Sequence, residues 1–168
     1  MRKKKGFGVL KKPVIKKKKF LFLEHTADMK FQAFGKTVEK VFINSASALK
    51  DAMAKGIKVA EIKKKIINIK RKDSEALLYA FLEEILYLLD AENFLTIRVS
   101  KIKIEKNTLK ANQRFPFKQN EFNLKATVIG DDASNYEFTN SVKAVTYNEM
   151  FVKKTENGSW VAQVVLDV

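Results

Sequence analysis

The sequence predicts an α+β fold in a single domain, with two main helices packed on a mostly antiparallel sheet and a C-terminal β-hairpin. Three observations support this prediction. Two helical patterns lie in the first half of the chain, β-branched strand patterns fill the second half, and Asn157-Gly158 separates the last two strands. Helices followed by a run of strands are typical of α+β proteins. Asn-Gly is a strong signal for the tight turn of a hairpin.

The first elements are two short strands. Residues 20–23 form an apolar run that suits a buried strand. Residues 28–34 alternate between apolar and polar side chains, and Gly35 ends the pattern. A period of two indicates a strand with one face in water.

The first helix is expected to begin after Thr37, which is a suitable N-cap residue. Apolar side chains recur at helical spacing from Val38 to Met53, and Gly56 supplies the stop. This amphipathic pattern favours packing of one helix face on the sheet. A strand among lysines is expected next, over residues 62–69.

The second helix is capped by Asp73 or Ser74 and extends to Asp90. Its apolar residues cover much of the circumference. We therefore expect it to be the more buried of the two helices.

The remainder of the chain has strand patterns separated by turn signals. We expect a bend at Ser100-Lys101 and turns at Asn107 and at Gly130-Asp131-Asp132. The expected strands cover residues 95–99, 102–105, 123–129, 142–152 and 160–168.

The net charge of +14 is concentrated at the start of the chain. Residues 1–20 hold ten basic side chains and no acidic one, whereas the other 148 residues carry 23 basic and 19 acidic side chains. Such a run repels itself and buries little, so we expect residues 1–19 to be a disordered basic tail on a domain over residues 20–168. Two interpretations of the tail stay open: an RNA contact through counterion release, or a solvated extension that aids solubility.

Composition also excludes several classes of protein and of site. The chain has no cysteine, which fits a cytoplasmic location, and no apolar run approaches the roughly 18 residues of a membrane span. Its scattered glycines form no phosphate-binding loop. The single histidine, His25, excludes sites that need two imidazoles. We interpret His25 as a structural, hydrogen-bonding residue.

The carboxylate of Asp167 is the most informative polar group. It interrupts an otherwise apolar closing strand, next to the terminal carboxylate of Val168. A buried carboxylate is costly without a cation, donors or water. Asp28, which lies 139 positions earlier, shares its strand face with Lys30. Oxygen anions brought together would bind a hard cation such as calcium, magnesium or manganese, but the sequence spacing does not pair the two aspartates.

Five segments together resemble the archease family, in matching order over about residues 20–168. The most specific are Phe22-Leu-Glu-His-Thr-Ala-Asp-Met29, Val142-Lys-Ala-Val-Thr-Tyr147 and the final Leu166-Asp-Val168. The other two are residues 34–39 and the helix over residues 77–90. Two positions depart from the family pattern: Lys30 stands where a glycine is typical, and Asn148 stands where a histidine is usual.

The resemblance implies a function and a site. Archeases are accessory proteins of the GTP-dependent tRNA-splicing RNA ligase, so this chain would be an activator and not an enzyme. It would promote guanylylation of the ligase's histidine with GTP, and hence multiple turnover. A divalent cation, calcium with magnesium or manganese as alternatives, would be held by Asp28, Asp167 and Val168. Lys143 would contribute to activation, and Lys30 would compete with the cation.

Other functions remain as alternatives. The chain could be a basic-tailed RNA-binding module that contacts RNA through residues 1–19, or a chaperone-like factor in tRNA processing. A metal-dependent hydrolase is disfavoured because no nucleophile or base stands out beyond His25. The expected partners are therefore the ligase and RNA, with no membrane.

Overall fold

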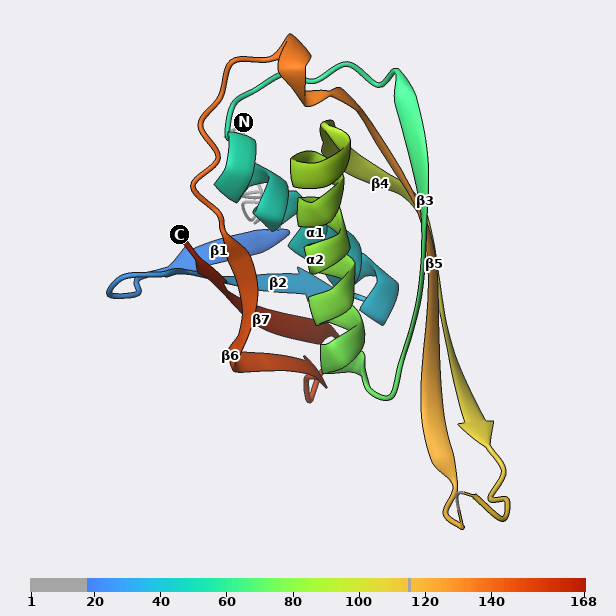
Figure 1. The fold of residues 1–168 in the computed structure, drawn as a ribbon. Coiled ribbons are helices and arrows are strands. Elements are labelled where there is room, and N and C mark those ends of the chain that lie inside the picture. The colour runs from blue at the N-terminus through green and yellow to red at the C-terminus, as the bar shows by residue number, and fades with distance from the viewer. Residues whose placement is uncertain (1–17, 115) are drawn as a thin grey trace, which may run out of the picture.

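Two antiparallel sheets enclose two helices in the computed structural model, which describes residues 18–114 and 116–168 (Figure 1). The predicted tail lies outside these residues except for Lys18 and Lys19. The elements are β1 (Phe20–Leu23), β2 (Met29–Gly35), α1 (Val38–Ala54), β3 (Lys63–Arg71), α2 (Ser74–Glu92), β4 (Phe94–Leu109), β5 (Gln119–Asp132), the 3-10 helix η1 (Ala133–Asn135), β6 (Ala144–Lys154) and β7 (Trp160–Asp167).

The predicted α+β class is confirmed, but the strands form two sheets instead of one. Sheet A has the order β1-β2-β7-β6, so the last strand of the chain lies inside it. Sheet B has the order β3-β5-β4. The helices lie between the sheets and contact both of them (Figure 1). All the strand pairs are antiparallel, as expected.

The first helix begins where the sequence predicted. The Thr37 hydroxyl accepts the backbone N–H of Lys40 at 3.2 Å, which caps one of the free donors of the first turn. The expectation that α1 is less buried than α2 is wrong: nine of 17 residues in α1 and ten of 19 in α2 are buried. The reason is that α1 packs between two sheets, so even Asn44 and Ser45 on it are buried.

The second helix begins at Asp73, whose carboxylate accepts the N–H of Ala76 at 2.7 Å. It ends at Asn93, which adopts the left-handed conformation with φ of 52° and donates its N–H to Leu88. Phe81 of this helix stacks on Phe42 of α1, with 6.0 Å between ring centroids. Their contact joins the helices at the centre of the core.

Sheet B corrects three local predictions. β4 is one continuous strand, because the expected bend at Ser100-Lys101 is absorbed by two irregularities in its register with β5. Asn107 lies within β4 and makes no turn. The predicted turn at Gly130-Asp131-Asp132 is also wrong, since these residues end β5.

Gly130 is needed for close packing instead of for a turn. It lies opposite Thr96 of β4 and Lys63 of β3. A Cβ atom at this position would lie 2.0 Å from the backbone oxygen of Leu95. Glycine in a strand often marks such an approach of another backbone.

Sheet A ends in the predicted hairpin between β6 and β7. Gly158 has a φ of +80° and donates its N–H to Thr155 at 2.9 Å. Thr155 in turn donates its backbone N–H to Ser159 at 2.7 Å, which closes the turn. Across the described residues, no helix has the length and apolar character needed to cross a membrane.

Candidate functional site

Asp28 and Asp167 lie beside the last paired position at one end of sheet A. The register of β2 with β7 pairs Met29 with Leu166. Asp28 immediately precedes Met29, and Asp167 immediately follows Leu166, so the two aspartates flank the same opposed pair. Strand pairing therefore brings to one end of the sheet two aspartates that the sequence spacing could not connect.

Lys143 and Val168 lie at the same end. Ala144 pairs with Asp167 in the register of β6 with β7. Lys143 donates its backbone N–H to the backbone oxygen of Asp167 at 2.8 Å, and its ammonium donates to a backbone oxygen of Val168 at 3.3 Å. The structure thus gathers all four site residues predicted from the sequence.

Neither aspartate at this end is neutralised by a basic side chain among the described residues. The Asp28 carboxylate, whose side chain is 34% exposed, lies 4.0 Å from Nδ1 of His25. Asp167 is exposed and has no side-chain partner within the described part of the chain. Carboxylates brought close together repel each other, and a cation between them would relieve the repulsion. Paired oxygen anions with a nearby backbone oxygen are the donor set that hard divalent ions prefer.

The ammonium of Lys30 pairs with a carboxylate other than those of Asp28 and Asp167. Its ammonium donates to Oε2 of Glu149 at 2.7 Å. The hydrogen bond and the positive charge of Lys30 hold the pKa of Glu149 below its ordinary value. The cation that we expected to oppose metal binding is therefore neutralised by another carboxylate.

Glu149 is a site residue that sequence reasoning missed. It lies in an irregularity of β6, where Thr146 pairs with Val165 but Phe151 pairs with Gln163. Its φ of 52° is unusual for a residue other than glycine. The amide of Gln163 donates to its backbone oxygen at 3.0 Å and holds the irregular segment.

One signal in the sequence could have revealed this irregularity. The apolar positions of the predicted strand include Val145 and Tyr147, then Met150 and Val152. The alternation therefore changes phase between Tyr147 and Met150, which is typical of a bulge.

His25 lies between two carboxylates. Its Nδ1 atom is 4.0 Å from Asp28, and its Nε2 atom is 4.0 Å from Oε1 of Glu149. The side chain is 17% exposed, and Nδ1 has no hydrogen-bond partner among the described residues. The hydrogen bond expected of a structural histidine is therefore not formed at Nδ1. His25 belongs to a polar cluster with Asp28, Lys30 and Glu149.

The arrangement at this end of sheet A agrees with the similarity of the whole chain to known proteins. Residues 20–168 match the model of the archease protein family. The chain belongs to the archease family. A curated protein archease from Methanosarcina barkeri is 36% identical over 155 residues, which cover 90% of this chain and 97% of that protein. A protein archease from Thermococcus kodakarensis is 35% identical, over 90% of this chain and 99% of the relative.

A solved structure supports the archease fold directly. The solution structure of protein 1598 from Methanobacterium thermoautotrophicum aligns with a TM-score of 0.67 and 28% sequence identity. The alignment covers 89% of this chain and 99% of that one.

Metal binding by this archease is still a prediction. Within residues 18–114 and 116–168, no group of three or more His, Asp or Glu side chains is placed to hold a metal ion. The predicted set differs from such a group, because it combines two carboxylates with an oxygen of Val168. Its ligands would have to be completed by water or by a partner molecule.

Proposed function

We propose that this archease is a non-catalytic accessory factor of the GTP-dependent tRNA-splicing RNA ligase. In this role it promotes guanylylation of the ligase with GTP and so sustains multiple turnover. The observation that supports the proposal is the convergence of Asp28, Asp167 and Lys143 at one end of sheet A. Asp167 and Lys143 at this end are both exposed, so a second protein can reach them.

The acidic pair and Val168 would hold a divalent cation, calcium with magnesium or manganese as alternatives. Calcium takes six to eight oxygen ligands, so water and ligase groups would fill the remaining positions. The bound ion would supply electrostatic stabilisation of charge on phosphoryl oxygens. Asp167 is exposed, which leaves the position open to a partner.

Lys143 is suited to contact the phosphates of a nucleotide. Its ammonium is held 3.3 Å from a backbone oxygen of Val168, which is a weak contact on the exposed side of the strand. A lysine in this position can turn towards an incoming phosphate and neutralise its charge. The side chain would therefore act together with the acidic pair.

The residues of the site favour a role in which the ligase supplies the catalytic groups and this protein does not. The described residues that gather there are carboxylates, two lysines and a histidine. Within the described part of the chain, Nδ1 of His25 has no hydrogen-bond partner, so no described hydroxyl group is bonded there for activation as a nucleophile. The alternative of a basic-tailed RNA-binding or chaperone-like factor depends on a tail that lies largely outside the described residues.

A guanylylation assay tests the proposal. The ligase would be incubated with labelled GTP alone, with this protein, and with this protein after treatment with a chelator. We expect stimulation by the untreated protein, and we expect Asp28→Asn and Asp167→Asn to abolish it. Asp90→Asn is the matched control, because Asp90 is exposed at the end of α2, away from the site. Full stimulation by both site variants would refute the proposal.

A further inference from the structure

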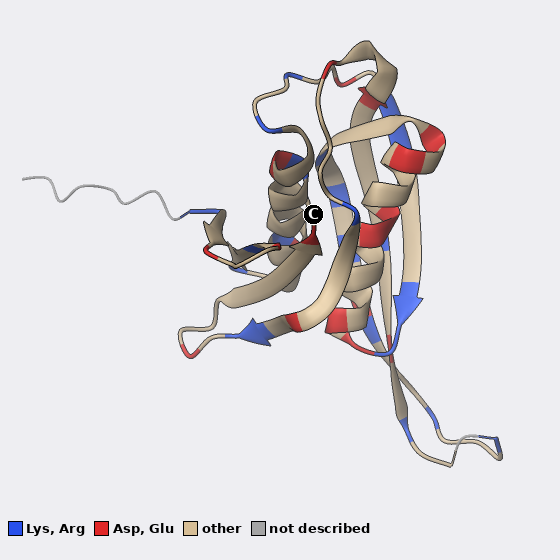
Figure 2. Cartoon of the chain, turned by 60° about the vertical axis from the view of Figure 1, so that its left-hand side comes forward, with Lys and Arg blue, Asp and Glu red and all other residues tan. Residues whose placement is uncertain are grey.

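The positive charge of the domain is concentrated in one segment of sheet B. Residues 101–125 carry seven basic and two acidic side chains, a net charge of +5. Residues 21–168 as a whole have a net charge of only +4, so everything outside this segment sums to −1. Figure 2 shows Lys and Arg along sheet B and its projecting end, whereas Asp and Glu are prominent on α2.

The neighbouring strand β3 adds to this charge. It contains five basic residues and no acidic one. Alternate residues of β3 face outward: Ile66 is 65% exposed, whereas Ile67 is 2% exposed. Lys64 and Lys70 share the outward face with Ile66 because side chains alternate along a strand. No helix of the described chain covers this face, since both helices lie on the inner side of the sheet (Figure 1).

Each strand of sheet B presents at least one lysine that forms no ion pair with a described carboxylate. Three such lysines are Lys64 on β3, Lys101 on β4 and Lys125 on β5, and all are exposed. None of them forms an ion pair with another described residue. The register places Lys125 opposite Lys103, and like charges in directly opposed positions destabilise a sheet. A bound polyanion would remove that repulsion.

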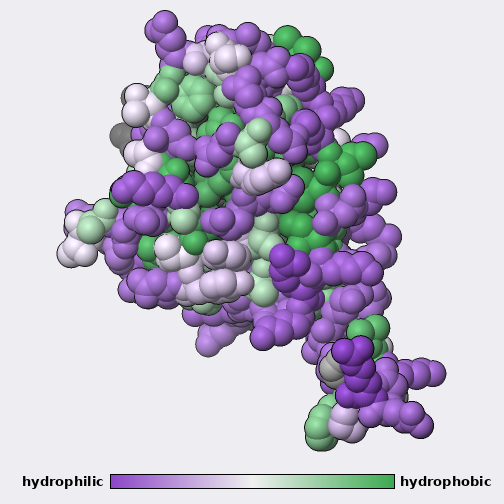
Figure 3. All heavy atoms as spheres, viewed as in Figure 1, coloured by the Kyte–Doolittle hydropathy of each residue, from purple (hydrophilic) through white to green (hydrophobic). Residues whose placement is uncertain are grey.

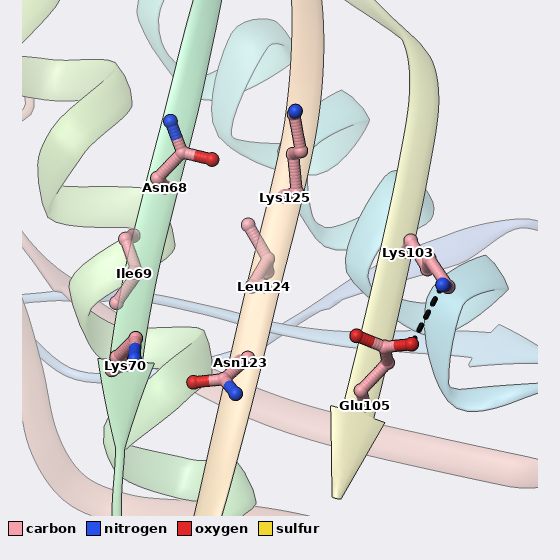
Figure 4. A pocket seen from close by; sticks show the side chains of 8 residues that line it. All are labelled: Asn68, Ile69, Lys70, Lys103, Glu105, Asn123, Leu124 and Lys125. Atoms are coloured by element: carbon pink, nitrogen blue, oxygen red, sulfur yellow. Dashed lines mark ion pairs between the residues drawn. The ribbon is translucent and has the colours of Figure 1, made fainter.

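A shallow hollow crosses all three strands at this point (Figure 4). One row of the register contributes Asn68, Lys125 and Lys103. The next row contributes Lys70, Asn123 and Glu105. The hollow therefore offers amide and ammonium donors, with Glu105 already paired to Lys103 at 2.6 Å.

The β4–β5 hairpin extends this surface into an arm that projects beyond the body (Figure 1). We define the arm as residues 106–114 and 116–120, which contain four basic side chains and no acidic one. Hydrophilic side chains cover most of it (Figure 3). Phe117 is an exception, because it is 77% exposed near the tip. An exposed aromatic ring among basic residues is a stacking platform for nucleobases.

We propose that the outer face of sheet B and the arm bind single-stranded RNA. Lys64, Lys101 and Lys125 would contact phosphates, and Phe117 would stack on a base. The choice of RNA among polyanions rests on the proposed function, which brings the protein to an RNA-joining enzyme. An acidic protein is a poorer fit, because a protein interface needs a buried apolar centre. The exposed Ile62 and Ile66 are separated along the chain by three consecutive lysines at residues 63–65.

Measurement of RNA affinity against salt concentration tests the inference. The full-length protein would be titrated into a fluorescently labelled, unstructured RNA, and Kd followed by anisotropy. In the variant with Lys64→Gln, Lys101→Gln and Lys125→Gln, we expect Kd to rise at least about tenfold near physiological salt. The slope of log Kd against log salt should fall by about 2, because each contact with a single strand contributes about 0.7.

Phe117→Ala separates stacking from charge. It should weaken binding several-fold with the salt slope unchanged, because stacking releases no counterions. The matched control replaces Lys55, Lys58 and Lys154, which are exposed lysines outside sheet B. The basic tail is present in all variants, so its contribution cancels in the comparison.

Three results would overturn the inference. They are an unchanged Kd and slope in the sheet B variant, an equal loss in the control variant, and a loss of ligase binding with RNA binding intact. A guanylylation assay without RNA distinguishes the proposed activation of the ligase from the proposed RNA binding by sheet B. The sheet B variant should stimulate guanylylation like the wild type, since the helices lie between sheet B and sheet A (Figure 1). Circular dichroism would verify that each variant is folded.

Discussion

The carboxylate of Glu83 accepts the backbone N–H of Val145 at 2.6 Å, across 62 positions of sequence. Glu83 lies on α2, and Val145 lies on β6, the edge strand of sheet A. A second carboxylate of α2, that of Glu75, accepts the N–H of Val152 at 3.1 Å. The helix thus supplies acceptors that a further strand would otherwise provide, and it protects the edge from pairing with another chain.

Replacing Glu83 should destabilise the fold. In Glu83→Ala the N–H of Val145, a residue only 3% exposed, loses its acceptor. An unsatisfied buried donor costs about 1–3 kcal/mol, and urea denaturation would measure the loss in unfolding free energy. Glu83→Gln retains an acceptor oxygen and should cost less. Glu84→Ala is the control on the same helix, and an equal loss there would show that the contact with Val145 is not the cause.

Calcium should stabilise this protein through the acidic pair. At a concentration 100-fold above Kd, a ligand that binds only the native state adds about 2.7 kcal/mol to the unfolding free energy. We expect a corresponding rise in Tm for the wild type, and none for Asp28→Asn or Asp167→Asn. Chelator should reverse the rise. A Tm that is unchanged by calcium, magnesium and manganese would exclude the site.

Lys143 should affect activation more than stability. Its ammonium is exposed, and its contact with Val168 is 3.3 Å long. We expect Lys143→Met to reduce stimulated guanylylation by roughly 10²-fold, a size typical for the loss of one preorganised electrostatic group. Tm should stay within a few degrees of the wild type. Lys143→Arg should recover part of the activity, because it restores the charge, and wild-type activity in Lys143→Met would contradict the assigned role.

Glu149 should titrate at a lower pH when Lys30 is present. Its pKa lies below the ordinary 4.5 because Lys30 donates a hydrogen bond and a positive charge. The pair therefore contributes stability above the pKa of the unfolded chain and loses it as pH falls through the folded pKa. Lys30→Met should raise the pKa of Glu149, as measured by carboxyl NMR, and flatten the stability profile in this acidic range. Lys36→Met, which removes an exposed lysine, should leave the pKa unchanged.

Gly130→Ala should be among the most damaging small substitutions. The new methyl group would lie 2.0 Å from the backbone oxygen of Leu95, which flexible side-chain movement cannot relieve. We expect a loss above about 3 kcal/mol in unfolding free energy, since even ordinary overpacking costs 1–3 kcal/mol. Gly56→Ala is the comparison, because Gly56 has open space around it and a φ of +79°. Its cost should be near 1 kcal/mol, and equal costs would disprove the packing argument.

Local chemistry made the helices and the last turn predictable. The caps at Thr37 and Asp73 bond to amides three residues later, so their signals are contained within one turn of sequence. The turn at Asn157-Gly158 depends on the left-handed conformation of one glycine. Gly130 also indicated a turn, but it lies within β5. Glycine is required there because the backbone of the neighbouring strand β4 leaves no room for a Cβ atom.

The sequence by itself determined the α+β class, the caps and the set of candidate residues, the last of these through resemblance to the archease family. Only the tertiary structure decided that Asp28 and Asp167 flank the same opposed pair, since this depends on the register of two strands far apart in the chain. It also decided that Lys30 pairs with Glu149 and that α2 completes the edge of β6. The physical reason is the same in each case. These contacts join segments that come together only when the chain folds, and side-chain periodicity reports the face of a strand but not its neighbour.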